Sequence, residues 1–194
     1  MMKFLKGVAK EFSPTFNKWD EPSVRDFNGL TVEGRPTRGF GDAPFKYAGK
    51  SMQPEPWTKQ MKGIKHYAER IASTHFDREV IFTFCLCGRY ETGQISIPHH
   101  SDTVPTQKDI VFSLSFGCPR VFEWTKYHYA IKKKTDTSKT HINRGKSYAM
   151  TTTYLLEHGD GLLFDGESQM YSTHAVPPIT GVGERINLTF RSGL

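Results

Sequence analysis

The stretch Arg185-Ile186-Asn187-Leu188-Thr189-Phe190-Arg191 alternates without exception between polar and apolar side chains. A period of two predicts a β-strand with one polar and one apolar face. The polar face carries two guanidinium groups and an amide, so it lies either in water or inside a barrel. Inside a barrel the two charges are costly unless they are paired. A ligand with two carboxylates, such as a small keto acid, would pair with both arginines.

The second half of the chain predicts further short strands. Apolar or alternating runs are separated by turn residues such as Gly117, residues 158–161 and the pair Pro177-Pro178. The predicted strands cover residues 80–86, 110–116, 121–124, 148–155, 162–164 and 186–190. Many short strands at this spacing favour a β-sandwich, a jelly roll or a barrel.

The first third of the chain predicts less regular structure and one helix. Residues 1–30 are weakly amphipathic and predict no clear element, whereas residues 31–56 are rich in Gly, Pro and aromatic residues, which indicates short strands and turns. Residues 57–72 place apolar side chains at helical spacing, which predicts an amphipathic helix packed on the sheet. These apolar residues are Trp57, Met61, Ile64, Ala68 and Ile71.

A second chemical pattern lies in the segment His100-Ser101-Asp102. Residues two apart in an extended chain point to the same side, so this imidazole and this carboxylate face one point. His174 follows later in the chain. Two histidines and one carboxylate on one face of a metal leave positions open for substrate and oxygen, which is the ligand set of non-haem Fe(II) oxygenases. His99 is offset by three from Asp102, so a strand would put it on the opposite face.

The composition excludes several classes of protein. The chain has 194 residues, of which 37% are hydrophobic, and this favours one globular domain over a disordered chain. We find neither an apolar run that could span a membrane nor a secretory signal. Three cysteines are too few for a disulfide framework, so we expect an intracellular protein, cytoplasmic or nuclear. Cys85 and Cys87 share one strand face and are interpreted as core residues rather than zinc ligands.

The net charge of +6 is concentrated in one segment. Residues 120–146 contain eight basic and two acidic residues, so this segment alone accounts for the whole excess. Concentrated positive charge favours a polyanionic partner such as nucleic acid, and the alternative is a solvated lysine-rich loop. The candidate contacts are Lys132, Lys133 and Lys134.

These segments together resemble the AlkB-type Fe(II)/2-oxoglutarate dioxygenases. Residues 185–191 are similar to that family's Arg-x-Asn-x-Thr-Phe-Arg signature, and His100-x-Asp102 is similar to its iron motif. Residues 156–161 leading to His174-Ala175-Val176-Pro177-Pro178 resemble the second half of the iron site. Tyr90-Glu91-Thr92-Gly93 resembles the tyrosine segment near the co-substrate, and parts of residues 31–57 resemble the nucleotide-recognition region of the DNA-repair members.

The resemblance implies a mainly β fold with flanking helices, a double-stranded β-helix or jelly roll with an N-terminal nucleotide-recognition lid. It implies that His100, Asp102 and His174 bind Fe(II), with 2-oxoglutarate and O2 as co-substrates. Arg185 and Tyr90 would bind the distal carboxylate of 2-oxoglutarate. Asn187 and Arg191 would serve its keto-acid end.

The resemblance also implies a division of the chain. Residues 1–30 would form an N-terminal extension, residues 31–80 the lid and its supporting helix, and residues 81–194 the catalytic core with a basic insertion at 125–146. In the lid, Phe45 and Tyr47 are candidate platforms for stacking a base, with ordinary strand packing as the alternative. His99 is a further candidate substrate contact, with a surface imidazole as the alternative.

Two departures from the family pattern bear on binding. The family commonly has an asparagine two residues before the tyrosine, where this chain has Gly88, so one co-substrate hydrogen bond is missing or supplied elsewhere. The repair members often continue the iron motif with two acidic residues that help to read the base, where this chain has Thr103 and Val104. The identity of the base therefore stays open.

The implied function is oxidative demethylation of N-alkylated bases in DNA or RNA, by a monomer without membrane contact. The base must be single-stranded or flipped out to reach the iron. One alternative is the same oxygenase chemistry on a protein or small molecule, because fold does not fix substrate. Another is a nucleic-acid-binding module with a degenerate iron site.

Overall fold

The computed structural model describes residues 1–22, 24–27, 30–47, 50–102, 110–127, 148–165 and 168–192. Its helical elements are α1 (Lys59–Phe76) and the short 3-10 turn η1 (Ser168–Met170). Its strands are β1 (Lys3–Leu5), β2 (Val24–Phe27), β3 (Leu30–Glu33), β4 (Thr37–Gly41), β5 (Phe45–Tyr47), β6 (Lys50–Met52), β7 (Phe84–Tyr90), β8 (Ile97–His100), β9 (Val111–Gly117), β10 (Arg120–Tyr127), β11 (Tyr148–Leu156), β12 (Gly161–Phe164), β13 (Ser172–Val176) and β14 (Arg185–Arg191).

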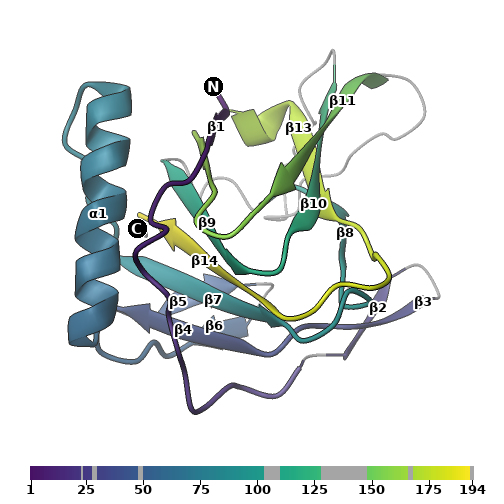
Figure 1. The fold of residues 1–194 in the computed structure, drawn as a ribbon, viewed down its shortest axis with the longest axis horizontal. Helices are drawn as coiled ribbons and strands as arrows, with labels where there is room; N and C mark the ends of the chain where they lie inside the picture. Colours follow the sequence, from purple (N-terminus) through teal and green to yellow (C-terminus); the bar gives the residue numbers. More distant parts are fainter. Residues whose placement is uncertain are drawn as a thin grey trace.

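Two antiparallel sheets form the body of the fold (Figure 1). The larger has the order β1-β12-β9-β14-β7-β4 and the smaller has the order β11-β10-β13-β8, so the chain crosses repeatedly between the sheets. Apolar side chains of both sheets meet in one cluster, with Phe122 and Trp124 from β10 and Leu162 and Phe164 from β12. The predicted mainly β jelly roll is confirmed. Two small hairpins, β2-β3 and β5-β6, are added to this body.

Helix α1 covers the outer face of the larger sheet (Figure 1). It begins after Thr58, whose hydroxyl accepts a hydrogen bond from the backbone N–H of Met61. It ends at Asp77, which adopts the left-handed conformation with φ 51°. The predicted helix is confirmed, although it starts two residues later and ends four residues later than expected. Its buried residues are Met61, Ile64, Ala68 and Ala72. The described helices include none with the length and hydropathy needed to cross a membrane.

Three expectations about strands need correction. Residues 1–30 do contain strands, because β1 pairs with β12 and β2 pairs with β3. The strand expected at 80–86 begins only at Phe84; Val80 and Phe82 are buried as part of the core but lie before the ladder. The strands β8 and β13 were absent from the predicted set, because their mixed polar sequences lack a period of two.

Strand β14 lies in the middle of the larger sheet, between β9 and β7. Its apolar residues face helix α1, with Leu188 and Phe190 in the core cluster beneath the helix. Its polar residues face the interior and are all buried: Arg185, Asn187, Thr189 and Arg191. Of the two environments open to this strand, the structure therefore selects the interior of the jelly roll.

Candidate metal centre

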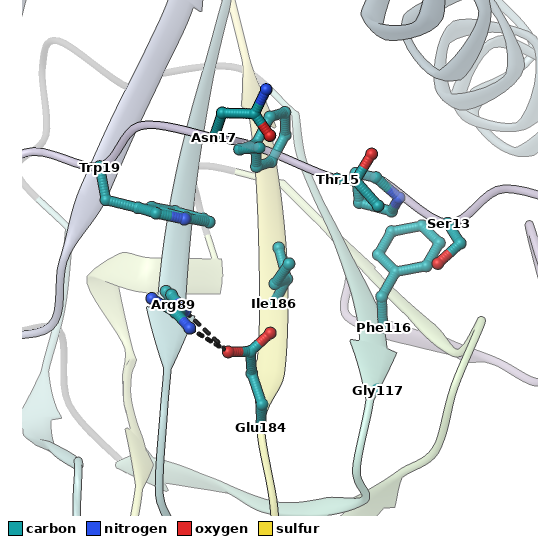
Figure 2. Close-up of a pocket in the computed structure, with 11 residues that line it drawn as sticks. Ser13, Thr15, Asn17, Trp19, Arg89, Phe116, Gly117, Glu184 and Ile186 are labelled. Atoms are coloured by element: carbon teal, nitrogen blue, oxygen red, sulfur yellow. Dashed lines mark hydrogen bonds and ion pairs between the residues drawn. The ribbon is translucent and has the colours of Figure 1, made fainter.

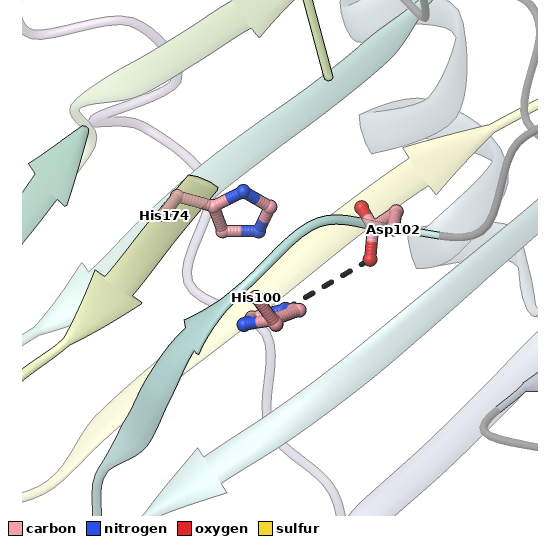
Figure 3. A group of neighbouring side chains, drawn as sticks. All are labelled: His100, Asp102 and His174. Atoms are coloured by element: carbon pink, nitrogen blue, oxygen red, sulfur yellow. Dashed lines mark ion pairs between the residues drawn. The ribbon is translucent and has the colours of Figure 1, made fainter. Parts of the chain in front are cut away.

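His100, Asp102 and His174 come together between the two sheets (Figure 3). His100 ends β8, and β13 places His174 directly opposite it. One ligand atom from each of the three side chains lies within 4.8 Å of the others. Nε2 of His100 is 3.9 Å from Oδ1 of Asp102, and the two imidazole centroids are 4.3 Å apart. The structure therefore brings together the three residues that the sequence selected.

The electrostatic surroundings favour the metal-binding forms of these groups. Burial, with a smaller contribution from the nearby His100, lowers the pKa of His174 to about 3. Burial also lowers the pKa of His100. Burial raises the pKa of Asp102, but the charge of Arg191 and the two histidines outweigh it, so that its pKa is lowered. Neutral imidazoles and an ionised carboxylate are the forms that bind a divalent metal.

Hydrogen bonds hold His100 and Asp102 from behind. The carbonyl of Pro98 lies 2.9 Å from Nδ1 of His100, which directs Nε2 towards the centre. Nη2 of Arg191 donates to Oδ2 of Asp102 over 2.9 Å. The backbone N–H of Asp102 donates to Oε1 of Gln169, also over 2.9 Å. Sequence analysis missed Gln169, because a single amide in a 3-10 turn belongs to no periodic pattern.

The donor set fits Fe(II). It offers two imidazole nitrogens and one carboxylate oxygen, and a metal held by three protein ligands keeps positions open for other ligands. Nδ1 of His174 is buried and has no hydrogen-bond partner among the described residues. The ring of His174 also stacks on Trp124, with centroids 5.8 Å apart and an interplanar angle of 8°.

A second group of buried polar side chains suits a carboxylate ligand. The guanidinium of Arg185 lies 4.9 Å from the centroid of the Tyr90 ring, and its Nη2 donates to Oγ of Ser115 over 2.8 Å. Its Nε and Nη1 have no hydrogen-bond partner within the part of the chain that the structure describes. Buried donors without partners are rare, and an anionic ligand would satisfy both. Arg185 and Tyr90, both predicted to bind the distal carboxylate of 2-oxoglutarate, therefore lie next to each other, and their contact with that carboxylate stays a prediction.

The other two residues expected at the keto acid are already engaged. The amide nitrogen of Asn187 donates to Oγ of Ser113 and to the carbonyl of Leu114, both at 2.8 Å. Arg191 pairs with Asp102. Direct contact of either residue with 2-oxoglutarate therefore stays a prediction.

The structure describes only some of the residues that were expected to contact the substrate. Phe45 is buried and stacks on Phe84, with centroids 4.1 Å apart. His99 lies on the face of β8 opposite His100, as expected, with Nε2 3.1 Å from Oε2 of Glu123. Only the backbone of Tyr47 is described. The remaining expected positions, Thr103, Val104, Lys132, Lys133 and Lys134, fall outside the described residues.

A hollow of about 380 Å³ lies elsewhere, on the outer face of the larger sheet (Figure 2). It is lined by the N-terminal segment around Phe16 and Trp19 and by the ion pair of Arg89 with Glu184. None of the three candidate metal ligands lines it. This hollow is therefore separate from the candidate metal centre.

A jelly roll with two histidines and one carboxylate on its inner face, beside buried arginines, is the architecture of a mononuclear non-haem iron oxygenase. Residues 14–191 match the 2OG-Fe(II) oxygenase superfamily, and the chain belongs to it. The cofactors expected from the sequence, Fe(II), 2-oxoglutarate and O2, are those of this family.

Comparison with individual proteins supports the AlkB-type resemblance. The chain is 30% identical to human alpha-ketoglutarate-dependent dioxygenase alkB homolog 3 over 162 residues, covering 81% of this chain and 51% of that protein. It is 25% identical to alpha-ketoglutarate-dependent dioxygenase AlkB of Escherichia coli over 143 residues, covering 71% of this chain and 57% of AlkB. The chain therefore spans about half the length of the curated relatives it matches. The solved structure of OsALKBH1 has the same fold, with TM-score 0.63, 17% identity, and coverage of 98% of this chain and 97% of that one.

Proposed function

We propose that the chain is an Fe(II)/2-oxoglutarate-dependent dioxygenase that removes N-linked alkyl groups from bases in DNA or RNA. The observation that carries the proposal is the group of His100, Asp102 and His174, together with the open donors of Arg185, which is buried on the same strand as Arg191, the partner of Asp102. The similarity to alkB homolog 3 and the basic segment 120–146 support a nucleic-acid substrate.

Each residue at the centre then has a distinct task. His100, Asp102 and His174 hold the iron, while Arg191 fixes the carboxylate of Asp102 and Gln169 fixes its backbone. Arg185 and Tyr90 take the distal carboxylate of 2-oxoglutarate. Bound Fe(II), 2-oxoglutarate and O2 supply the oxidation, which hydroxylates the N-alkyl carbon so that it leaves as an aldehyde, with succinate and CO2 as co-products. The aromatic side chains around His174 exclude bulk water.

The proposal includes an arrangement of the chain around this centre. Residues 81–194 form the catalytic core with a basic insertion at 125–146, residues 31–80 form a lid with its supporting helix, and residues 1–30 form an N-terminal extension. A single-stranded or flipped-out base enters beneath the lid, and its proposed contacts are Phe45, Tyr47 and His99. We further propose that the enzyme acts as a monomer in the cytoplasm or nucleus.

The test is a turnover assay with defined substrates. The protein is loaded anaerobically with Fe(II) and 2-oxoglutarate, exposed to air, and given N-methylated single- and double-stranded DNA and RNA oligonucleotides. Mass spectrometry should show the loss of one methyl group from a particular base, and Asp102→Ala should abolish that loss. Succinate formation with every oligonucleotide unchanged would contradict the proposed substrate and favour a protein or small molecule instead.

A further inference from the structure

The inner face of β7 lacks a side chain at Gly88, whose partner Asn187 lies on β14 between Arg185 and Arg191, the residue that pairs with Asp102. The register pairs Gly88 with Asn187 of β14 on one side and with Thr37 of β4 on the other. Two residues further along β7, Tyr90 pairs with Arg185. Gly88 therefore lies two residues from Tyr90 on β7, and its partner Asn187 lies two residues from Arg185 on β14.

The side chain of Arg35 occupies the space that Gly88 leaves. A Cβ added at Gly88 would lie 2.8 Å from Cδ and 3.2 Å from Cζ of Arg35, so any larger residue at position 88 would displace this guanidinium. Arg35 reaches this place because the backbone N–H of Arg89 donates to the carbonyl of Pro36 over 2.9 Å, which extends the pairing of β4 with β7. The segment before β4 thus places the guanidinium of Arg35 next to Gly88 of β7.

Arg35 and Arg185 approach the same aromatic ring. The guanidinium of Arg35 lies 5.5 Å from the centroid of Tyr90, and that of Arg185 lies 4.9 Å from it. The guanidinium of Arg120 lies 5.3 Å from the same centroid, but it donates to the backbone carbonyls of Thr92, Ile95 and Pro177. Cation–π attraction to the Tyr90 ring offsets part of the repulsion among these guanidiniums. Because Arg35 lies over Gly88, opposite Asn187, its guanidinium is next to the inner face of β14, which also carries the buried Arg185.

The charge of Arg35 also acts on Arg185. Burial has the largest influence in lowering the pKa of Arg185, and the positive charges of Arg120 and Arg35 lower it further. Arg185 is buried and Arg35 is half-buried, and an anion between their guanidiniums would offset the repulsion between them. A dicarboxylate would provide one negative group for each guanidinium.

We propose that Arg35 contacts the keto-acid carboxylate of 2-oxoglutarate. The absence of a side chain at Gly88 leaves the space that the guanidinium of Arg35 occupies. Arg185 holds the distal carboxylate, and Arg35 holds the end that faces the metal. The proposal rests on the proposed function, because that function supplies the ligand. It also makes the segment before β4 part of the co-substrate site as well as of the lid.

The test is co-substrate binding without turnover. Protein loaded with Mn(II) under anaerobic conditions is titrated with 2-oxoglutarate by calorimetry. Arg35→Gln should raise the dissociation constant of 2-oxoglutarate by about 10- to 100-fold, the loss expected for one charge-assisted hydrogen bond, with Mn(II) affinity unchanged. Arg38→Gln is the matched control, because Arg38 lies nearby in the chain but pairs with Glu55. The dissociation constant of 2-oxoglutarate for this variant should stay within about twofold of the wild-type value.

Gly88→Ala provides a second, independent variant. The added Cβ displaces Arg35, so it should weaken 2-oxoglutarate binding as Arg35→Gln does, and the double variant should lose little more than either single one. Additive losses would overturn the proposal. So would unchanged 2-oxoglutarate affinity in Arg35→Gln, including the case in which that variant loses only oligonucleotide affinity. A wild-type protein that binds no 2-oxoglutarate would instead refute the proposed function itself.

Discussion

Asp102 is the most constrained residue of the candidate centre. Its carboxylate pairs with Arg191 of β14, and its backbone N–H is held by Gln169 of η1. The hydroxyl of Ser101 donates to the carbonyls of Gln169 and Ser172, so η1 is tied to this segment at a second point. Asp102 lies beyond the end of β8, and these contacts hold it in a fixed position although it belongs to no strand.

We predict that Gln169→Ala weakens metal binding by about 10- to 100-fold, because groups that orient a metal ligand have effects of this size. Titration with Mn(II), followed by electron paramagnetic resonance, measures the affinity. Gln53→Ala, at an exposed position, is the control and should leave it unchanged. Equal affinities in both variants would show that Asp102 needs no support from η1.

The ligands themselves could be predicted from sequence, whereas their support could not. His100 and Asp102 stand two apart in an extended segment, and the arginines of 185–191 alternate with apolar residues, so both patterns carry a geometric meaning. Gln169 and Arg35 act through contacts across the fold, with partners 67 and 53 residues away, respectively, at Asp102 and Gly88. Neither residue stands out in its own neighbourhood.

At the scale of elements, β14 could be predicted from the sequence, whereas β1 could not. Strand β14 is seven residues long and alternates strictly, so its two faces could be assigned in advance. Strand β1 is three residues long and gains its stability from tertiary contacts. The buried carboxylate of Asp160 accepts hydrogen bonds from the backbone N–H groups of Gly7 and Glu157 and from the ammonium of Lys6. These contacts fasten the N-terminal segment to the turn before β12.

This attachment predicts a dependence of stability on pH. Burial raises the pKa of Asp160, but the hydrogen bonds from Gly7, Glu157 and Lys6 outweigh it and lower the pKa. The unfolded chain therefore binds the proton more readily, so the contribution is complete above the ordinary pKa of about 3.9 and is lost as the pH falls through the lower folded value. Asp160→Asn should reduce the free energy of unfolding at pH 7 and flatten its decline below about pH 4.

Urea unfolding at several pH values measures this effect. An Asp160→Asn variant with the wild-type slope between pH 3 and pH 5 would contradict the assigned role.

Helix α1 supports the larger sheet from outside. Ile64 is fully buried between the helix and the sheet. We predict that Ile64→Ala lowers the free energy of unfolding by about 2–5 kcal/mol, as for other large-to-small core substitutions. Ile81→Ala is the control, because Ile81 is 55% exposed and should change it by less than about 0.5 kcal/mol. Comparable losses in both variants would contradict the packing described for α1.

At the scale of the whole molecule, charge and chemistry occupy different parts of the chain. The excess positive charge lies in residues 120–146, whereas the three candidate metal ligands and Arg185 lie outside that segment. Replacing Lys132, Lys133 and Lys134 by glutamine should therefore weaken oligonucleotide binding without changing metal affinity.

The salt dependence of binding gives the measurement. Each lost contact with a duplex phosphate should reduce the slope of log K against log salt concentration by up to about 0.9. An unchanged slope would mean that the lysines are only solvated.

The most direct test of the central claim is an anaerobic titration of the chain with Fe(II) in the presence of 2-oxoglutarate. We predict that the wild-type chain binds a single iron, that Asp102→Ala and His174→Ala each abolish this binding, and that His66→Ala on the exposed side of α1 retains it. Iron bound equally well by the first two variants would contradict the assignment of His100, Asp102 and His174 as the metal centre.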